Sequence, residues 1–384
     1  MARRANKEGS IYQRKSDGKW VASITLDNGS RKVFYADNQG DALKKLKKAV
    51  QEQEKGTLAV GPQHTLAQYL DYWLGVYKPS IRPRSHERYE QIIRLHLVPT
   101  LGKVKLDKLS PQHLQTLYTK KLEEGLSTNT VLVIHGMLHK ALKSAMRWGI
   151  LAQNVCDRVD VPRKTPFEIH PLTVEQIQKL IAAVRGHTNE ALFILAIATG
   201  MRRGEIAGLK WQDVNMEQAT LQVQRALTRV PTAMGSGYQE AEPKTEKSRR
   251  SIALPDFAIV ALIKHRERQE VIKQKAGEYW QEHDYVFCTS VGEHIHPGHH
   301  ILEEFKKLLK KAGLPDIRFH DLRHSSATLL LSMGTHPKIV QERLGHHDIG
   351  TTMNIYSHVL PSMQEGAMKQ MDTLFGEKPK DSKS

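Results

Sequence analysis

The second half of the chain places arginine, lysine, histidine and tyrosine in short polar segments. In chain order these are TGMRRGE at 199–205, PKT at 243–245, HDLRH at 320–324 and LGHHDIGTTMNIYSH at 344–358. A guanidinium group is a planar donor that suits phosphate oxygens. Imidazole and ammonium groups transfer protons, and a phenol becomes a nucleophile once its proton is removed. Together, these residue types are suited to chemistry on a phosphate ester.

The charge of the whole chain favours a polyanionic partner. Its 384 residues include 57 lysines and arginines against 41 aspartates and glutamates, which gives a formal net charge of +16. An excess of this size is typical of proteins that bind nucleic acids. We therefore expect nucleic acid to be the partner.

Motifs for nucleotides and metals are weak or absent. The sequence has no GxxxxGK[ST], and the GSG at 235–237 lacks the third glycine of a dinucleotide fingerprint, so we expect a flexible hairpin loop there. Histidines gather at 294–300 and at 320–358, without HExxH and without a cysteine or carboxylate at ligand spacing. We expect no nucleotide cofactor and no metal.

The polar segments, in their order, wording and spacing, strongly resemble the motifs of the tyrosine recombinase, or phage integrase, family. A lone HxxR arises often by chance, whereas these segments in this order are a specific signal. The whole chain is also similar to the three-module integrases of temperate phages and conjugative transposons. The resemblance implies a metal-independent, site-specific DNA recombinase that integrates and excises a mobile element or prophage.

The resemblance also implies a catalytic set around one DNA phosphate. Its members are Arg202, Lys244, His320, Arg323, His346 and Tyr356, with Glu205 supporting the arginines from behind. Arg202 and Arg323 would clamp the non-bridging oxygens, and His346 would donate a hydrogen bond to the phosphate. Attack by Tyr356 would give a 3′-phosphotyrosyl enzyme and a free 5′-hydroxyl. Because one phosphodiester replaces another, no nucleotide is consumed.

Two proton transfers are needed at neutral pH. A tyrosine has a pKa of about 10, so roughly one in a thousand is ionised at pH 7, and Tyr356 needs a base or a cationic site. His320 lies three residues before Arg323, which would place both on one helix face, and it is the candidate base. Lys244, with an ordinary pKa of about 10.4, is the candidate acid for the 5′-oxygen. Strand-like residues on each side of 231–243 predict a β-hairpin that carries Lys244.

Length and composition predict a multidomain α+β protein. Hydrophobic residues make up 39% and charged residues 26% of the chain, which excludes fibrous and wholly disordered classes. Within residues 1–60, Asx-Gly turns at 16–18 and 27–29 separate alternating runs, predicting a three-stranded sheet with a helix over 40–55. A narrow sheet can enter a major groove, and the resemblance implies an arm-type DNA-binding domain. A solvated basic surface is the alternative for this segment.

Helical periodicity dominates residues 64–164, with helix starts signalled at Thr65, Ser110 and Ser127. This pattern predicts a bundle of four or five helices, which the resemblance identifies as a core-type DNA-binding domain. The pattern of residues 170–376 predicts a mostly helical domain with a small β-sheet, which the resemblance identifies as a catalytic domain with the DNA breaking-rejoining fold. Linkers are expected at 56–63 and 161–171, and a disordered tail at 377–384.

Cysteine usage and hydropathy favour the cytoplasm. Cys156 and Cys288 are far apart and form no CxxC, so we expect structural roles and no disulfide framework. The first residues run into polar sequence without the apolar core of a signal peptide, and no run of about 18 apolar residues occurs. We expect a cytoplasmic, nucleoid-associated protein of a bacterial host, without membrane contact.

Two other functions would use part of this pattern. A type IB topoisomerase-like strand transferase would share the phosphotyrosine chemistry but act as a monomer, and a non-catalytic DNA-binding regulator would keep only the charge. The resemblance implies instead a homotetramer on double-stranded DNA with core-type and arm-type attachment sites. An accessory DNA-bending or excision factor is a further candidate partner.

A helical apolar stripe after Tyr356 fits packing either in its own core or on a neighbouring protomer (Met363, Ala367, Met371, Leu374).

Overall fold

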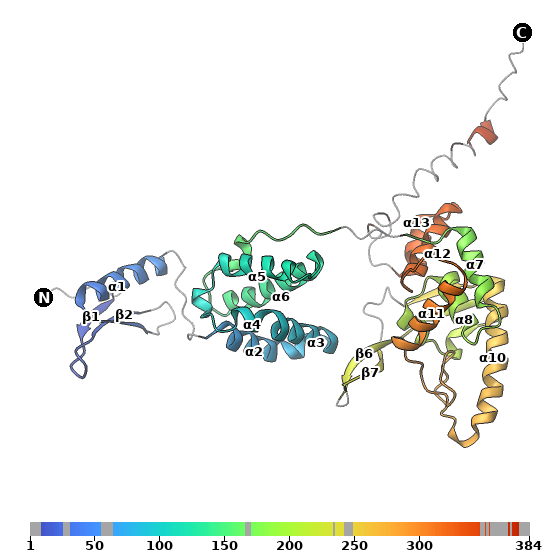
Figure 1. The fold of residues 1–384 in the computed structure, drawn as a ribbon, viewed down its shortest axis with the longest axis horizontal. Coiled ribbons are helices and arrows are strands. Elements are labelled where there is room, and N and C mark those ends of the chain that lie inside the picture. Colours follow the sequence, from blue (N-terminus) through green and yellow to red (C-terminus); the bar gives the residue numbers. More distant parts are fainter. Residues whose placement is uncertain are drawn as a thin grey trace, which may run out of the picture. The chain divides into compact units, whose positions relative to one another are not determined.

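The computed structural model describes residues 9–25, 31–54, 64–165, 170–232, 235–241 and 249–345, together with 350, 353, 368 and 371–375. The chain divides into two compact units, Met1–Pro166 and Phe167–Ser384 (Figure 1). The expected turn at 27–29, the linker at 56–63 and the tail at 377–384 lie outside the described residues.

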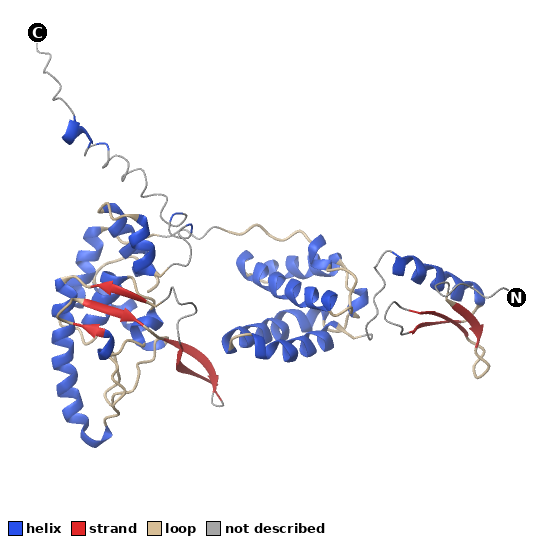
Figure 2. Cartoon of the chain, turned by 180° about the vertical axis from the view of Figure 1, so that it is seen from behind, coloured by secondary structure: helices blue, strands red, loops and turns tan. Residues whose placement is uncertain are grey.

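An antiparallel sheet with one helix on it forms the N-terminal part of the chain (Figure 2). Its elements are β1 (Ser10–Gln13), β2 (Trp20–Thr25), β3 (Arg31–Ala36) and α1 (Gln39–Glu54). Alternate residues of β2 point to opposite faces, so Ala22 and Ile24 pack under α1 while Val21 faces away. On that open face Val21 lies between Tyr12 and Tyr35, which are about half exposed. The predicted three-stranded sheet with its helix is confirmed.

Residues 64–165 form a helical bundle. Its helices are α2 (Leu66–Tyr77), α3 (Pro83–Ile92), α4 (Val98–Leu101), α5 (Pro111–Glu123) and α6 (Thr128–Arg147), and a π-helical turn (Ile93–Leu97) joins α3 to α4. The predicted N-caps are confirmed: the side chains of Thr65, Ser110 and Ser127 each accept a hydrogen bond from the backbone N–H three residues later. In the buried core the Tyr69 hydroxyl donates to the Ala141 carbonyl at 2.6 Å.

The second unit is mostly helical. Its helices are α7 (Val174–Val184), α8 (Glu190–Thr199), α9 (Arg203–Ala207), α10 (Asp256–Ala276), α11 (His299–Lys311), α12 (Asp321–Ser332) and α13 (Pro337–Leu344). Its strands are β4 (Val214–Asn215), β5 (Thr220–Val223), β6 (Ala226–Thr232), β7 (Gly235–Ala241) and β8 (Arg250–Ala253). Helix α8 is apolar around its circumference and is accordingly almost entirely buried. No helix in the described ranges is long and apolar enough to cross a membrane.

The strands of this unit make two antiparallel arrangements. One sheet has the order β4-β5-β8, and β6 and β7 form a separate two-stranded hairpin that projects from the domain in Figure 1. The prediction of a loop at 235–237 is wrong, because β7 begins at Gly235 and pairs with the end of β6. A Cβ on Gly237 would lie 2.9 Å from the Thr232 methyl carbon, so the missing side chain permits close strand approach.

The base of the hairpin packs against α9. A Cβ added to Gly204 would lie 2.6 Å from the Leu227 carbonyl oxygen, and one added to Gly208 would lie 3.1 Å from the Leu227 nitrogen. Glycine at both positions therefore allows β6 to lie directly on the helix.

We predict that Gly204→Ala destabilises the second unit by about 1–3 kcal/mol, because the methyl group forces β6 away from α9. The matched control is Gly136→Ala in α6, where an added Cβ meets nothing within 4 Å. That change should raise stability by about 0.5–1 kcal/mol, since alanine loses less backbone entropy. Urea unfolding of the full chain measures both changes, and an unchanged midpoint for Gly204→Ala would show that β6 is not packed this closely.

Candidate functional site

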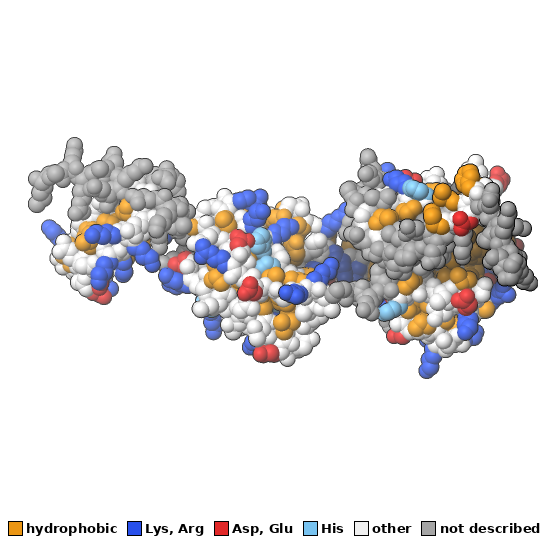
Figure 3. Space-filling model, turned by 90° about the horizontal axis from the view of Figure 1, so that it is seen from above, with side chains coloured by type: hydrophobic (Ala, Val, Ile, Leu, Met, Phe, Trp, Pro, Cys, Tyr) orange, Lys and Arg blue, Asp and Glu red, His pale blue; other side chains and the backbone are white. Residues whose placement is uncertain are grey.

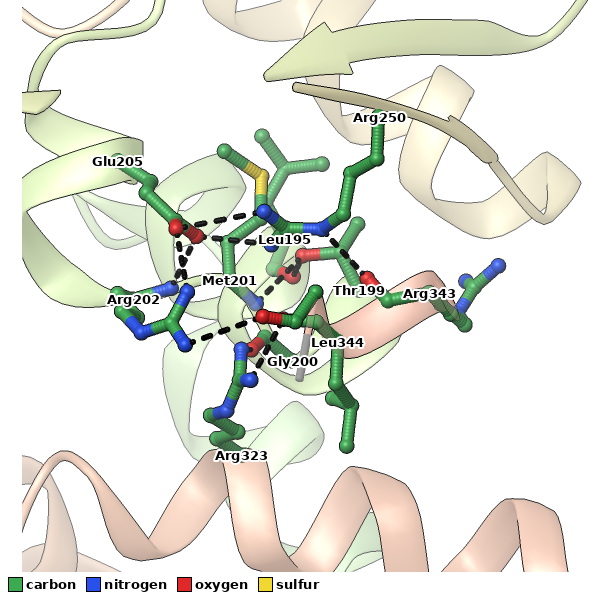
Figure 4. A network of polar contacts seen from close by, with 11 residues as sticks. Leu195, Thr199, Gly200, Met201, Arg202, Glu205, Arg250, Arg323, Arg343 and Leu344 are labelled. Carbon is green, nitrogen blue, oxygen red and sulfur yellow. Dashed lines mark hydrogen bonds and ion pairs between the residues drawn. The ribbon is translucent and has the colours of Figure 1, made fainter. Parts of the chain in front are cut away.

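The C-terminal end of α13 is where the arginine-bearing segments of the second unit meet. Three successive carbonyl groups each accept a hydrogen bond from a different guanidinium (Figure 4): Arg250 Nε to Arg343 at 2.7 Å, Arg323 Nη2 to Leu344 at 2.5 Å and Arg202 Nη2 to Gly345 at 3.5 Å. The last carbonyls of a helix lack partners within the helix and lie at the negative end of its dipole, so cations suit them. This convergence fixes the backbone directly before His346.

Glu205 lies between two of these arginines. Its carboxylate accepts hydrogen bonds from Arg202 Nη1 at 2.8 Å and from Arg250 Nη2 at 2.8 Å, and it also accepts from the Arg202 backbone N–H at 2.9 Å. Burial raises the pKa of Glu205, but the hydrogen bond and charge of Arg250 and the charge of Arg202 outweigh it and lower the pKa to about 2. Glu205 is therefore ionised at neutral pH and orients both guanidinium groups.

Arg323 joins the ends of two helices. Its Nη1 donates to the Gly200 carbonyl at 2.8 Å, at the end of α8, while its Nη2 donates at the end of α13. Gly200 has a φ of 63°, and a Cβ there would lie 2.6 Å from Leu344 Cδ2, so glycine permits the two helix ends to approach. Arg323 is only 2% exposed, whereas the side chain of Arg202 is 42% exposed. Arg202 is thus the outward-facing cation of the pair.

His320 is the N-cap residue of α12, directly before the helix that carries Arg323. It keeps an exposed edge, and its ring contacts that of His324 at 5.1 Å between centroids. Partial enclosure by protein, followed by the positive charges of Arg323 and Arg202, lowers the pKa of His320 below its usual value. The imidazole is therefore neutral near pH 7, which is the form that accepts a proton.

The structure brings four of the predicted residues together. Glu205 lies in α9 and Arg202 directly before it, while Arg323 lies in α12 and His320 directly before that helix. The other predicted catalytic residues, Lys244, His346 and Tyr356, lie outside the described residues. Sequence reasoning missed Arg250, which binds Glu205 and the end of α13 with a side chain only 6% exposed. An arginine at the start of a short strand resembles a surface residue, so no signal in the sequence singled it out.

A cavity of about 410 Å³ lies beside His320. Its lining combines cationic with apolar side chains: Met201, Arg203, Leu302, Lys306, Arg318, Phe319 and His320. Within the described ranges, no group of three or more histidine, cysteine, aspartate or glutamate side chains is placed to hold a metal ion. The polar side chains of this lining are Arg203, Lys306, Arg318 and His320, a donor set suited to an anion such as phosphate.

We predict that Glu205→Gln destabilises the protein by at least about 3 kcal/mol at pH 7, since it leaves buried guanidinium charge unpaired. The pKa of Glu205 falls from its ordinary 4.5 to about 2 on folding, so its ionised form stabilises the fold above pH 4.5. This contribution is lost as the pH falls through the folded value.

The difference in free energy of unfolding between wild type and variant should therefore narrow between about pH 5 and pH 2. Unfolding by guanidinium chloride at a series of pH values measures this difference. A difference that stays constant across this range would mean that the carboxylate does not carry the predicted charge.

Two family descriptions match the chain. Residues 170–363 match the phage integrase family, and residues 65–122 match the N-terminal SAM-like domain of phage integrases. The first match covers the described α7–α13 and the site built on them, and the second covers the start of the helical bundle.

Curated relatives extend the similarity over nearly the whole chain. A XerC-like tyrosine recombinase of Caldanaerobacter subterraneus subsp. tengcongensis is 33% identical, over 98% of this chain and 100% of the relative. An integrase of Saccharopolyspora erythraea is 26% identical, over 97% of this chain and 98% of its own length. The ICEBs1 integrase of Bacillus subtilis is 25% identical, over 77% and 79% of the two chains.

Solved structures share the fold. The Tn1549 transposon integrase in complex with a circular intermediate DNA superposes with a TM-score of 0.69 at 22% identity, covering 80% of this chain and 99% of that one. A lambda integrase dimer bound to a core site gives a TM-score of 0.57 at 17% identity, covering 92% and 96%. The predicted multidomain α+β fold is confirmed. This chain belongs to the phage integrase family of tyrosine-type, site-specific DNA recombinases.

Proposed function

We propose that this protein integrates and excises a mobile element or prophage by cleaving and rejoining DNA strands through a 3′-phosphotyrosyl intermediate. The observation that carries the proposal is the convergence of Arg202 and Arg323 at the end of α13, with His320 near both charges and ionised Glu205 behind Arg202. These groups form a preorganised cationic site with a proton acceptor at its edge, as phosphoryl transfer requires.

The arginines stabilise the charge that develops on the phosphate. Arg202, with its exposed side chain, supplies N–H donors to the non-bridging oxygens, while the buried Arg323 contributes its charge from beneath. Glu205 holds the Arg202 guanidinium in place, so little reorganisation is needed when charge builds up. His346 follows the carbonyl of Gly345 directly and donates a hydrogen bond to the phosphate.

The chemical step exchanges one phosphodiester for another. Tyr356 loses its phenolic proton to His320 as its oxygen attacks phosphorus, and the bond from phosphorus to the 5′-oxygen breaks. The electron pair of that bond stays on the 5′-oxygen, which takes a proton from the Lys244 ammonium. In the reverse reaction a 5′-hydroxyl attacks the phosphotyrosine and rejoins a strand.

The N-terminal parts of the chain bind DNA as well. The bundle at 64–164 contacts the core-type site, and lysine and arginine side chains are spread over its visible face in Figure 3. The sheet of residues 1–60 contacts an arm-type site through its open face. There Tyr12 and Tyr35 are exposed, and the Arg14 guanidinium lies 5.0 Å from the centre of the Tyr35 ring.

Recombination between two duplexes requires four cleavages, so the working assembly on DNA is a homotetramer in which each protomer supplies one Tyr356. The catalytic domain spans residues 170–376, and the chain acts in the cytoplasm of a bacterial host, on the nucleoid. An accessory DNA-bending or excision factor sets the direction of the reaction.

We predict that Tyr356→Phe abolishes covalent protein–DNA adducts on a nicked half-site duplex, because no phenol remains to attack phosphorus. DNA binding should stay unchanged, since the ring is retained. Tyr279→Phe, at a tyrosine that is 81% exposed, is the matched control and should form adducts at the wild-type rate. Denaturing gels measure the adducts, and their persistence in Tyr356→Phe would refute this nucleophile.

We predict that deleting residues 1–60 lowers integration on full-length attachment sites at least about tenfold, while cleavage of a core-type half-site stays within about twofold. The lost phosphate contacts should also reduce the salt dependence of binding to full-length sites. Equal integration by the deleted and full chains would rule out arm binding.

Product analysis on paired sites tests the topoisomerase-like alternative, because relaxed circles without recombinants would support it.

A further inference from the structure

Near the end of β7, four residues before Lys244, a carboxylate joins a cluster of polar side chains that the mechanism above does not use. Glu240 accepts a hydrogen bond from Lys210 Nζ at 2.8 Å and one from the Tyr285 hydroxyl at 2.6 Å. Arg225 Nε lies 3.7 Å from the second carboxylate oxygen. Arg225 is also paired with the buried Asp213, so the cluster is continuous.

Three members of the cluster are largely withdrawn from solvent, and the Glu240 side chain at its edge is 38% exposed. Tyr285 is 7% exposed, and the side chains of Arg225 and Lys210 are 15% and 20% exposed. Burial raises the pKa of Glu240, but the hydrogen bonds from Lys210 and Tyr285 outweigh it, and the pKa lies below its usual value. A partly buried network with satisfied partners holds its members in one geometry, so this end of β7 is fixed to the body of the domain.

The neighbouring strand is fixed at the same level of the hairpin. Leu227 of β6 lies opposite Glu240 in the strand register, and its backbone packs against Gly204 and Gly208 of α9. Helix α9 begins directly after Arg202 and contains Glu205. The base of the hairpin and the main phosphate-binding arginine are therefore parts of one packed structure.

The described chain is also fixed on the far side of Lys244, which itself lies outside the described residues. Six residues after Lys244, Arg250 binds Glu205 through Nη2 at 2.8 Å. The two attachments limit where the Lys244 ammonium can reach.

We propose that Glu240 is a positioning residue for Lys244: bound to Lys210, Arg225 and Tyr285, it fixes the end of β7, from which the chain runs on to the general acid. This inference rests on the proposed function, in which Lys244 protonates the 5′-oxygen. If the strand end shifts, the ammonium is misplaced and the oxygen must leave as an unprotonated alkoxide. Misplacement of a catalytic group by about 1 Å can cost up to a hundredfold in rate.

A substrate with sulfur in place of the 5′-bridging oxygen separates this role from a merely structural one. A thiol has a pKa of about 8.5, so a thiolate leaves readily without an acid, whereas an alkoxide does not. A defect that acts through the general acid should therefore disappear on the sulfur substrate. A defect in folding, in DNA binding or in the arginine site should remain on both substrates.

The experiment measures single-turnover cleavage by the full chain on nicked half-site duplexes with oxygen or sulfur at that position. The duplex comes from the DNA flanking the gene, located by footprinting. Lys244→Ala should lose at least about a hundredfold on oxygen and stay near wild type on sulfur. Glu240→Gln should lose about tenfold on oxygen and stay within about twofold of wild type on sulfur.

Two further variants sharpen the test. Tyr285→Phe removes one hydrogen bond to Glu240 with little change in shape, and it should show the same pattern with a smaller loss on oxygen. If Glu240→Gln fails to fold, as thermal unfolding would reveal, Tyr285→Phe replaces it as the test variant. Glu217→Gln, the same charge change at an exposed residue between β4 and β5, is the matched control and should match wild type on both substrates.

The outcomes separate the two proposals. If Lys244→Ala recovers on sulfur but Glu240→Gln is equally slow on both substrates, or shows no loss on oxygen, the positioning role is overturned while the general acid stands. If Lys244→Ala is equally slow on both substrates, Lys244 is not the acid, and both its proposed role and that of Glu240 fail.

Discussion

A buried carboxylate must be surrounded by cations, and Glu205 imposes this constraint on the catalytic domain. Its charge is stabilised by Arg202, directly before α9, and by Arg250 from β8, two segments separated by the whole hairpin. Both arginines also reach the end of α13, where Arg323 joins them. One ionised group thereby ties together a helix start, a strand start and a helix end. The cationic site is in this way assembled before any phosphate arrives.

Local structure was predictable where the sequence carries local signals. The caps at Thr65, Ser110 and Ser127 begin helices because a side-chain oxygen meets a free backbone N–H three residues later, an interaction within one turn. The motif segments singled out Arg202, His320 and Arg323 as candidates, and the fold brings these three residues together. Their contacts with the carbonyls at the end of α13 depend on how distant helices pack, and no local pattern encodes that arrangement.

The remaining features depend on partners remote in sequence. The residues that flank Arg250 in the sequence give no sign of a buried ion pair, and only tertiary packing places Arg250 against Glu205. The glycines at 235–237 favour a turn by local propensity, yet pairing with β6 overrides that preference and makes them part of a strand. Gly204 lies in the segment TGMRRGE, which was singled out for Arg202 and Glu205, whereas glycine is needed at 204 because the Leu227 carbonyl packs against it.

The attachment of the β6–β7 hairpin at its base has a practical consequence for engineering. Leu227 and Glu240 secure the two strands beside α9 and the polar cluster, at the base of the hairpin. A substitution at this base would disturb the strands, the helix that follows Arg202 and the polar cluster together. Redesign of the recombinase for other DNA should therefore leave these positions unchanged.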